Sequence, residues 1–237
     1  MADPARVKRF WTDVAAVPAD GGWRVELDGR PLRTPGGRPQ VVPGLALAGA
    51  LAEEWRSLGE QVDPRGFPLR DLADLALDQV QPDREAAITR LMAYAETDTL
   101  CYRADPDEPL YRRQIVLWEP LVTAAEARHG VRLERASGIN HRPQPRATLS
   151  RLREVLGGYD DFTLAALMAL APLAASLTVG LSALEPVADL RALFAAANCE
   201  EDWQAEQWGW DGEAEAARAA RLAAFEIAAR FARLARG

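Results

Sequence analysis

The sequence predicts an α+β protein with two domains: a small N-terminal domain, residues 1–81, with an antiparallel β-sheet and helices, followed by a larger all-α C-terminal domain, residues 82–237. Three observations predict this fold class. A β-hairpin signal lies near the N-terminus, helical patterns fill the chain from about residue 82, and 237 residues can form two small domains with sizeable cores. We place the boundary at Pro82.

The hairpin signal is local and strong. Residues 23–27 alternate apolar and charged side chains, which is the period of a half-buried strand. Asp28-Gly29 follows and is typical of a type I′ turn, because both turn positions need a positive φ. We expect residues 30–34 to return as the partner strand and residues 41–42 to add a further short strand.

One helix is predicted in the N-terminal domain, over residues 44–59. Four apolar side chains recur there at spacings of four, four and three residues and form one stripe: Leu47, Leu51, Trp55 and Leu58. Gly59 is a plausible stop. We therefore expect the stripe, Trp55 included, to face the core.

The C-terminal domain is predicted to be helical throughout. Its expected helices begin at Pro82-Asp83 and continue over residues 109–129, 148–156, 186–198 and 213–236. Gly130 is expected to cap the helix 109–129, and arginines near the C-terminus favour the dipole of the closing helix.

An uncharged segment, residues 162–184, is long enough to span a bilayer. It contains Pro172 and Gly180, however, and its flanks are acidic with no nearby lysine or arginine to set an orientation. We therefore predict a buried helix or a kinked helix pair rather than a membrane span.

Composition excludes several classes of protein. The formal net charge of −7 disfavours a nucleic-acid-binding protein, which needs a basic surface. Two cysteines, Cys101 and Cys199, are too few for a disulfide framework, so we expect buried free thiols in a reducing compartment. The first residues lack the apolar stretch of a signal peptide, and we expect a cytoplasmic location.

Catalytic and metal-binding patterns are missing from the sequence. His129 and His141 belong to no metal-ligand spacing, and His129 is expected to lie at a helix C-terminus. No G-x-S-x-G, P-loop or G-x-G-x-x-G motif occurs, so we expect no cofactor and no metal. Carboxylates are abundant, and an enzyme that uses buried carboxylates stays an alternative.

The most distinctive region is an acidic segment, residues 185–215. It carries nine acidic residues and one basic residue, and its charge of −8 exceeds that of the whole chain. It also holds three of the seven tryptophans. One interpretation is a solvated helix face with tryptophans packed into the core. The other is a protein-binding surface, in which tryptophans supply apolar area and acids steer a basic partner.

Helical spacing sharpens the second interpretation. Glu200, Gln204 and Trp208 share one helix face, and Asp202 and Glu206 share another. Like charges four residues apart destabilise a helix unless something cationic meets them. The candidate partner-binding residues are Glu200, Glu201, Asp202, Trp203, Gln204, Glu206, Trp208, Asp211, Glu213 and Glu215.

A series of short motifs runs through nearly the whole chain in a specific order. They are Leu27-Asp28-Gly29-Arg30-Pro31 with Thr34-Pro35; Ala52-Glu53-Glu54-Trp55; Asp63-Pro64 with Pro68-Leu69; Asp78; Tyr94, Glu96, Asp98, Leu100, Tyr102 and Arg103; Gln114 with Trp118-Glu119-Pro120-Leu121; and Asp202-Trp203-Gln204 with Trp208-Gly209, Asp211 and Glu213-Ala214. In these motifs the sequence resembles the assembly chaperones of the ATP synthase F1 sector that act on its alpha subunit.

This resemblance implies a two-part fold, no catalysis and no cofactor. It implies that the protein holds the unassembled alpha subunit until the beta subunit arrives. The family occurs in mitochondria and in related bacteria, and a bias of 27 arginines to one lysine favours a bacterial cytoplasm. We expect a monomer; a structural subunit that stays in a larger complex is a further alternative.

Overall fold

The computed structural model describes residues 7–63, 66–138 and 142–237, so Pro64 and His141 lie outside the described residues. The chain forms two compact units. Unit 1 comprises the described residues up to Arg84 together with Asp161–Ala165 and Arg230–Gly237, and unit 2 comprises Glu85–Asp160 and Ala166–Ala229. The α+β fold class is confirmed, whereas the domain boundary at Pro82 stays a prediction.

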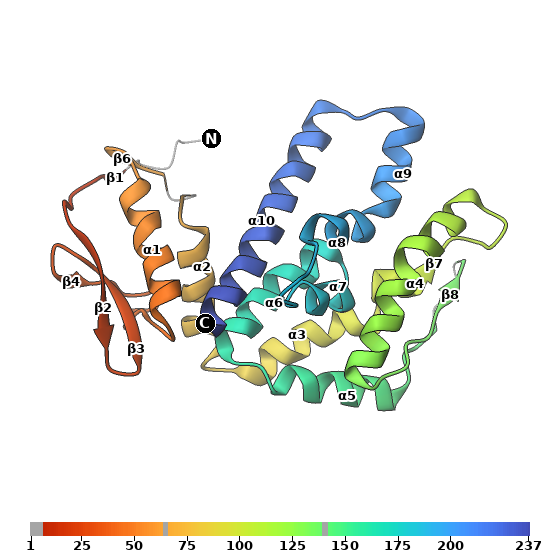
Figure 1. Cartoon of the computed structure of the whole chain (residues 1–237), viewed down its shortest axis with the longest axis horizontal. Coiled ribbons are helices and arrows are strands. Elements are labelled where there is room, and N and C mark those ends of the chain that lie inside the picture. The colour runs from red at the N-terminus through yellow and green to blue at the C-terminus, as the bar shows by residue number, and fades with distance from the viewer. Residues whose placement is uncertain (1–6, 64–65, 139–141) are drawn as a thin grey trace. The chain divides into compact units, whose positions relative to one another are not determined.

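Unit 1 is built on a four-stranded antiparallel sheet (Figure 1). Its strands are β2 (Val14–Ala19), β3 (Gly22–Leu27), β4 (Arg30–Pro31) and β5 (Val41–Val42). β3 pairs with β2 along its whole length, and with β4 and β5 on its other side. The hairpin 23–34 is confirmed, although β4 ends at Pro31, while β2 was not predicted. A two-stranded sheet joins β1 (Val7–Lys8) to β6 (Gln61–Val62).

The turn between β3 and β4 has the predicted geometry. Asp28 and Gly29 have φ of 50° and 75°, as a type I′ turn requires. The Asp28 carboxylate also accepts hydrogen bonds from the backbone N–H groups of Thr12 at 3.0 Å and Asp13 at 2.8 Å. These backbone donors lower the pKa of Asp28. The residue therefore makes the turn and also fixes the segment that precedes β2.

Helix α1 (Leu45–Ser57) packs on β2 and β3 through its buried apolar face. Leu47 and Leu51 are fully buried, as predicted. Trp55 is half-buried, and its ring lies 5.0 Å from that of Trp11 and 4.4 Å from that of Phe67. The apolar stripe thus joins the helix to an aromatic cluster.

A second helical stretch in unit 1 was not predicted: α2 (Pro68–Leu75) continues directly into the π-helix η2 (Ala76–Val80). Glu54 binds its first turn, accepting the N–H of Leu69 at 2.7 Å and of Arg70 at 3.0 Å. Asp78 accepts hydrogen bonds from Thr34 Oγ1 at 2.7 Å and from the Gly36 N–H at 2.8 Å. Several of the short sequence motifs thus meet through hydrogen bonds that a carboxylate side chain accepts.

The later segments of unit 1 bond to its earlier part and to one another. Arg84 forms an ion pair with Asp161. The rings of Phe162 and Phe231 lie 6.2 Å apart, and Phe231 is fully buried. Unit 1 is therefore assembled from three segments that are distant in sequence.

Helices dominate the rest of the chain (Figure 1). They are α3 (Arg84–Glu96), η3 (Thr99–Cys101), α4 (Pro109–His129), α5 (Arg146–Gly157), α6 (Asp161–Ala174), α7 (Leu177–Ser182), α8 (Leu190–Ala197), α9 (Cys199–Trp208) and α10 (Gly212–Arg236). Two short parallel strands, β7 (Tyr102–Arg103) and β8 (Ala136–Ser137), also pair. The predicted helix over residues 109–129 is confirmed as α4, and Gly130 follows as its C-cap with φ of 65°.

Helix α8 begins later than predicted, at Leu190 instead of Pro186. The Asp189 side chain accepts a hydrogen bond from the Ala192 N–H at 3.0 Å and so forms the N-cap. The residues from Pro186 to Asp189 lie outside the helix.

The uncharged segment forms the predicted kinked helix pair, α6 and α7. The break lies at Ala175, which has φ of 46°, and Ser176 then caps α7 by accepting the Val179 N–H at 3.0 Å. Leu167 and Leu170 are fully buried. Over residues 7–63, 66–138 and 142–237, the structure has no helix of the length and apolarity that crossing a membrane requires.

Both cysteines are free and buried, as predicted. Burial raises the pKa of the Cys101 thiol to about 12. Burial also raises the pKa of Cys199. Neither thiol is therefore an activated nucleophile at neutral pH.

Candidate protein-binding site

The acidic segment, residues 185–215, contains α8, α9, the connection to α10 and the first turn of α10 (Figure 1). Helix α9 carries Glu200, Glu201 and Asp202 in its first turn, where carboxylates favour the helix dipole. It ends at Trp208, and Gly209 follows as its C-cap with a φ of 86°, which suits a residue without a side chain. Asp211 then accepts the Glu213 N–H at 3.1 Å and caps α10.

Asp202 forms the most complete ion pair of the segment. Arg218 of α10 donates to it from Nε at 2.7 Å and from Nη2 at 2.6 Å. The Asp202 side chain is only 20% exposed, and the Arg218 side chain is only 16% exposed. The Arg218 guanidinium also lies 5.2 Å from the ring centroid of Phe194 and 5.9 Å from that of Trp210. This bidentate pair fixes α9 to α10.

Two further arginines bind the acids of α9. Arg221 of α10 pairs with Glu201. Arg113 of α4 donates to Glu206 at 2.5 Å, and its guanidinium lies 5.8 Å from the ring centroid of Trp203. The hydrogen bond from Arg113 lowers the pKa of Glu206.

Glu200 differs from these three acids because its partner is an uncharged amide. Its Oε1 accepts a hydrogen bond from Gln114 Nε2 at 2.8 Å. Gln114 is fully buried, and its own Oε1 accepts the Ala104 N–H at 2.8 Å. Glu200 thus connects α9 to the start of α4.

The closely spaced acids of α9 need nearby cations, and arginines of the same chain supply them. Residue spacing contained a signal for it that the sequence analysis missed. Asp202 and Arg218 lie at equal distances on either side of Trp210, and Glu201 and Arg221 lie nearly so. Such symmetry is expected when two antiparallel helices meet across a short turn. The position of Arg113, in contrast, depends on the packing of α4 and has no such signal.

The tryptophans of the segment lie at the surface. Trp208 is 80% exposed and Trp210 is 41% exposed, while Trp203 is half-buried. The interpretation in which these tryptophans pack into the core is therefore wrong for Trp208 and Trp210. Isolated apolar side chains at a surface are ordinary, whereas two exposed indoles here lie beside one turn, so the contact surface stays a prediction.

The remaining candidate residues lie close to these indoles. Gln204, Asp211, Glu213 and Glu215 are all exposed. Among the residues that the structure describes, neither Glu213 nor Glu215 forms an ion pair. The structure thus brings the predicted residues together on α9 and the start of α10, with two kinds of acid: those held by arginines and those without a counter-ion.

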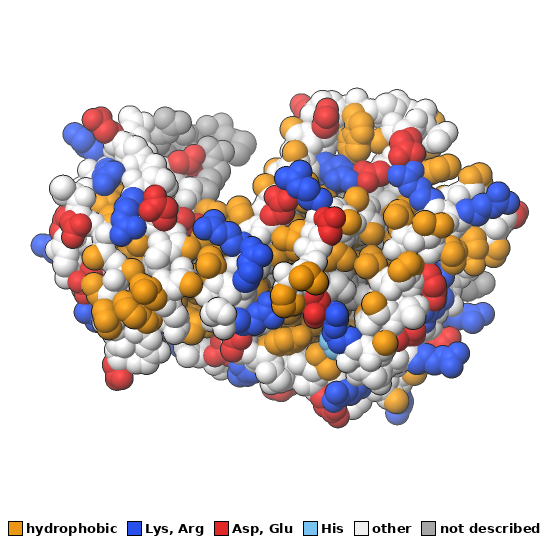
Figure 2. Space-filling view, in the orientation of Figure 1, with side chains coloured by type: hydrophobic (Ala, Val, Ile, Leu, Met, Phe, Trp, Pro, Cys, Tyr) orange, Lys and Arg blue, Asp and Glu red, His pale blue; other side chains and the backbone are white. Residues whose placement is uncertain are grey.

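Charged side chains elsewhere are also mixed in sign. Figure 2 shows arginine and lysine side chains interspersed with acids over the displayed face, rather than one field of a single sign. The ion pairs within each unit, such as Arg84 with Asp161 and Arg128 with Glu185, agree with this distribution. Glu213 and Glu215 differ from these paired acids in having no arginine partner among the described residues.

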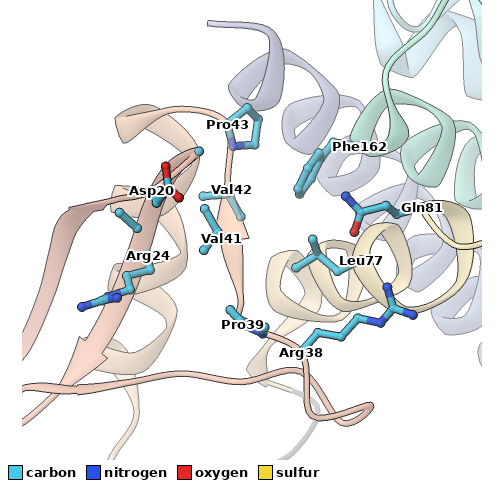
Figure 3. A pocket seen from close by; sticks show the side chains of 12 residues that line it. Asp20, Arg24, Arg38, Pro39, Val41, Val42, Pro43, Leu77, Gln81 and Phe162 are labelled. Carbon is cyan, nitrogen blue, oxygen red and sulfur yellow. The ribbon is translucent and has the colours of Figure 1, made fainter.

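Unit 1 contains an open groove of about 650 Å³ beside β5 (Figure 3). Val41, Val42 and Pro43 lie opposite Leu77 and Phe162. One carboxylate, two guanidiniums and one amide are the charged and polar side chains in its lining: Asp20, Arg24, Arg38 and Gln81. The two guanidiniums are paired with Glu26 and Asp78. A groove of this kind holds no pair of carboxylates, so it gives the enzyme hypothesis no site.

Within the described residues, burial raises the pKa of Glu54 and Asp74 in unit 1, which accept hydrogen bonds from the first turn of α2 and from Gln40, and that of one carboxylate in unit 2. Burial raises the pKa of Asp98, which accepts hydrogen bonds from Ser176 Oγ at 2.6 Å and the Thr178 N–H at 2.8 Å. Asp98 and His129 line an internal cavity of only about 10 Å³. That volume holds at most a single water. Asp98 therefore joins helices rather than binding a substrate.

Over the described ranges, 7–63, 66–138 and 142–237, no three His, Cys, Asp or Glu side chains lie close enough to hold a metal ion. His129 is half-buried, and burial lowers its pKa.

Comparison with known proteins agrees with the sequence motifs. The family model described as "ATP12 chaperone protein" matches residues 8–126. The mitochondrial protein atp12 of Schizosaccharomyces pombe is 28% identical over 214 residues, which cover 85% of this chain and 74% of that protein.

Solved structures are similar over nearly the whole chain. Atp12 from Paracoccus denitrificans is 41% identical with a TM-score of 0.91, and the match covers 96% of this chain and 98% of that one. A mutant of the same protein gives the same identity and TM-score. The Atu1473 protein of Agrobacterium tumefaciens is 36% identical with a TM-score of 0.91, over 97% of this chain and 86% of that one. The chain therefore belongs to the ATP12 chaperone family, the family of ATP synthase assembly chaperones that its motifs resemble.

Proposed function

We propose that this protein binds the unassembled alpha subunit of the ATP synthase F1 sector and prevents its aggregation until the beta subunit replaces it. The proposal includes the acidic segment as the contact surface, a monomeric state, a bacterial cytoplasmic location and no enzymatic activity. A subunit that waits for its place in a ring exposes apolar interface, and such surface promotes aggregation. A reversible cover for that surface is the task that the family membership favours.

The observation that carries the proposal is the exposure of Trp208. A side chain of this size at 80% exposure has nearly all of its apolar surface in water. Trp210 lies two residues away, and Glu213 and Glu215 follow at the start of α10. Apolar contact area bordered by acids suits a client that presents apolar interface bordered by basic groups.

The proposal is tested by a pull-down with isolated alpha and beta subunits at low and high salt. We expect retention of alpha but not of beta, and weaker retention at high salt because exposed charges are screened. Charge reversal of Glu213 and Glu215 to arginine is expected to reduce retention. Reversal of Asp107 and Glu108, two exposed acids before α4, changes the net charge equally and serves as the matched control.

Two results would contradict the proposal. Failure of the wild-type protein to retain alpha under both conditions would reject the client. Stoichiometric retention of the protein in the finished ATP synthase would instead favour the alternative of a structural subunit.

A further inference from the structure

We propose that the acids of α9 do not contact the client themselves: Glu201, Asp202 and Glu206 are positioning residues, and the client contact is the indole tip. The indole tip is defined as Trp208, Trp210, Glu213 and Glu215. The inference rests on the proposed function and divides its contact surface into two parts with different tasks. The partner that fits the tip is a protein surface with an apolar pocket bordered by lysine or arginine.

The first argument concerns Asp202. Its two carboxylate oxygens are both occupied by Arg218, and both side chains are largely buried. A client cation would have to displace a bidentate guanidinium that already lies between Phe194 and Trp210 at cation–π distances. Removing either charge leaves the other uncompensated, which is costly in a partly buried position. The pair therefore holds α9 and is poorly placed to bind a partner.

The second argument concerns the two ends of α9. Glu201 is held by Arg221 from α10, and Glu206 is held by Arg113 from α4. The three arginines thus bind α9 near its start and near its end, immediately before Trp208. Their common effect is to fix the direction in which α9 presents Gly209 and the two flanking indoles.

The third argument concerns the tip. The left-handed backbone of Gly209 separates Trp208 from Trp210, and the chain then turns into α10. Arg218 lies 5.9 Å from the Trp210 ring centroid, while Trp208 has no comparable contact within the described structure and is 80% exposed. Trp208 is therefore the side chain that is free to enter a pocket on a partner.

Charge decides which partner fits. From residue 207 to residue 217 the chain carries Asp211, Glu213 and Glu215 and no basic residue. An anionic membrane or a nucleic acid would be repelled, and two tips from two copies of the chain would repel each other. A basic rim around an apolar pocket is complementary to both features of the tip.

The decisive variant is Arg218→Met, which removes the cation and leaves the Asp202 carboxylate available to a client. If Asp202 acts through Arg218, this variant and Asp202→Asn should both lower retention of the alpha subunit at least tenfold. Both should also increase amide hydrogen exchange in α9. If Asp202 contacts the client directly, Arg218→Met should retain alpha as well as the wild type does, and that result overturns the inference.

The exchanged pair Asp202→Arg with Arg218→Asp gives a second test. Restoration of retention to within about threefold of the wild type is expected, because the positioning contact is rebuilt with its charges reversed. If α9 hydrogen exchange is normal but the alpha subunit is no longer retained, the client recognises the carboxylate at position 202 directly. That result would overturn the inference.

The indole tip is tested with the variant Trp208→Ala. The separate variants Val116→Ala and Val187→Ala serve as controls, because both valines are exposed apolar side chains on the same unit. We expect at least tenfold loss of retention for the tryptophan variant, with unchanged melting and unchanged α9 exchange, and no loss for the controls. Retention by Trp208→Ala equal to that of the wild type would overturn the tip, as would a change in sedimentation showing that Trp208 joins two copies. The α9 exchange measurement needs no client, so failure of the positioning role is distinguishable from failure of the proposed function.

Discussion

Two adjacent regions of the chain, residues 162–184 and residues 185–215, stabilise their helices by opposite means. The first has no charge and buries its side chains, with Leu167 and Leu170 fully removed from solvent. The second is dominated by acids, and its helix α9 is held by arginines from α4 and α10. The difference teaches that a charged, exposed helix can be positioned firmly without a large apolar face, which leaves its tryptophans available for contact.

The same contrast appears in two carboxylates, one that bonds to the first region and one that belongs to the second. Asp98, which bonds to the start of α7, accepts hydrogen bonds from a hydroxyl and from backbone N–H groups, and burial raises its pKa. Glu206 is exposed, and Arg113 lowers its pKa. One carboxyl is therefore part of the interior of the fold, and the other is part of a surface ion pair.

The largest expected effect is on the apolar region. Leu167→Ala should lower the free energy of unfolding by about 2–5 kcal/mol, because it removes a fully buried side chain and leaves a cavity. Urea denaturation monitored by circular dichroism measures this change. A loss below about 1 kcal/mol would break the comparison, since the uncharged region would then not carry the stability assigned to it.

The next largest effect on stability is expected at Trp118, which binds helix α8 of the acidic region. Trp118 is fully buried and donates from Nε1 to the Ala196 carbonyl of α8 at 2.7 Å. Trp118→Phe should cost about 1–3 kcal/mol, because it removes the indole donor from a carbonyl in the buried core. Thermal melting measures the loss, and hydrogen exchange should locate the loosened region in α8.

The pH dependence of the two carboxylates should have opposite signs. The raised pKa of Asp98 means that its contribution to folding is full below the unfolded pKa and is lost as pH rises through the folded pKa. The lowered pKa of Glu206 means that its contribution is present above the unfolded pKa and is lost as pH falls through the folded pKa. Denaturation of the wild type, Asp98→Asn and Glu206→Gln from pH 7 down to about pH 3 tests both. On acidification, the difference from wild type should grow for Asp98→Asn and shrink for Glu206→Gln, and equal slopes would contradict the assignment.

The smallest effect on stability is expected at the indole tip. Trp208→Ala should change the free energy of unfolding by no more than about 0.5 kcal/mol, because the side chain is 80% exposed. The same variant is expected to lose client retention. A large destabilisation would instead place Trp208 among the structural residues and remove the distinction between the two regions.

Local signals predicted much of this fold. Asp28 and Gly29 form the expected turn because both positions require positive φ, and α4 has the expected bounds, with Pro109 at its start and Gly130 after its end. Strand β2 was missed because its sequence, Val-Ala-Ala-Val-Pro-Ala, does not alternate, and its pairing with β3 decides its structure. Helix α2 was missed because the N–H groups of its first turn donate to the side chain of Glu54, which lies outside the helix and earlier in the sequence.

The candidate surface was predicted in part. The acids and tryptophans are evident in the sequence, but their counter-ions are brought in from residues 113, 218 and 221 by packing. Exposure could not be predicted either: Trp118 is fully buried while Trp208 is 80% exposed, and both occur in short motifs of the series that runs through the chain. Which tryptophan meets solvent depends on the neighbouring helices rather than on its own residue type.

The assembly of unit 1 from three distant segments has a consequence for synthesis on the ribosome. The sheet and α1 emerge first, yet the segment that carries Phe231, which stacks near Phe162, is translated more than a hundred residues later. The part of unit 1 that is made first therefore stays without its last segment, Arg230–Gly237, until translation is almost complete. A protein that we propose to protect another from premature exposure therefore passes through the same vulnerable stage in its own biogenesis.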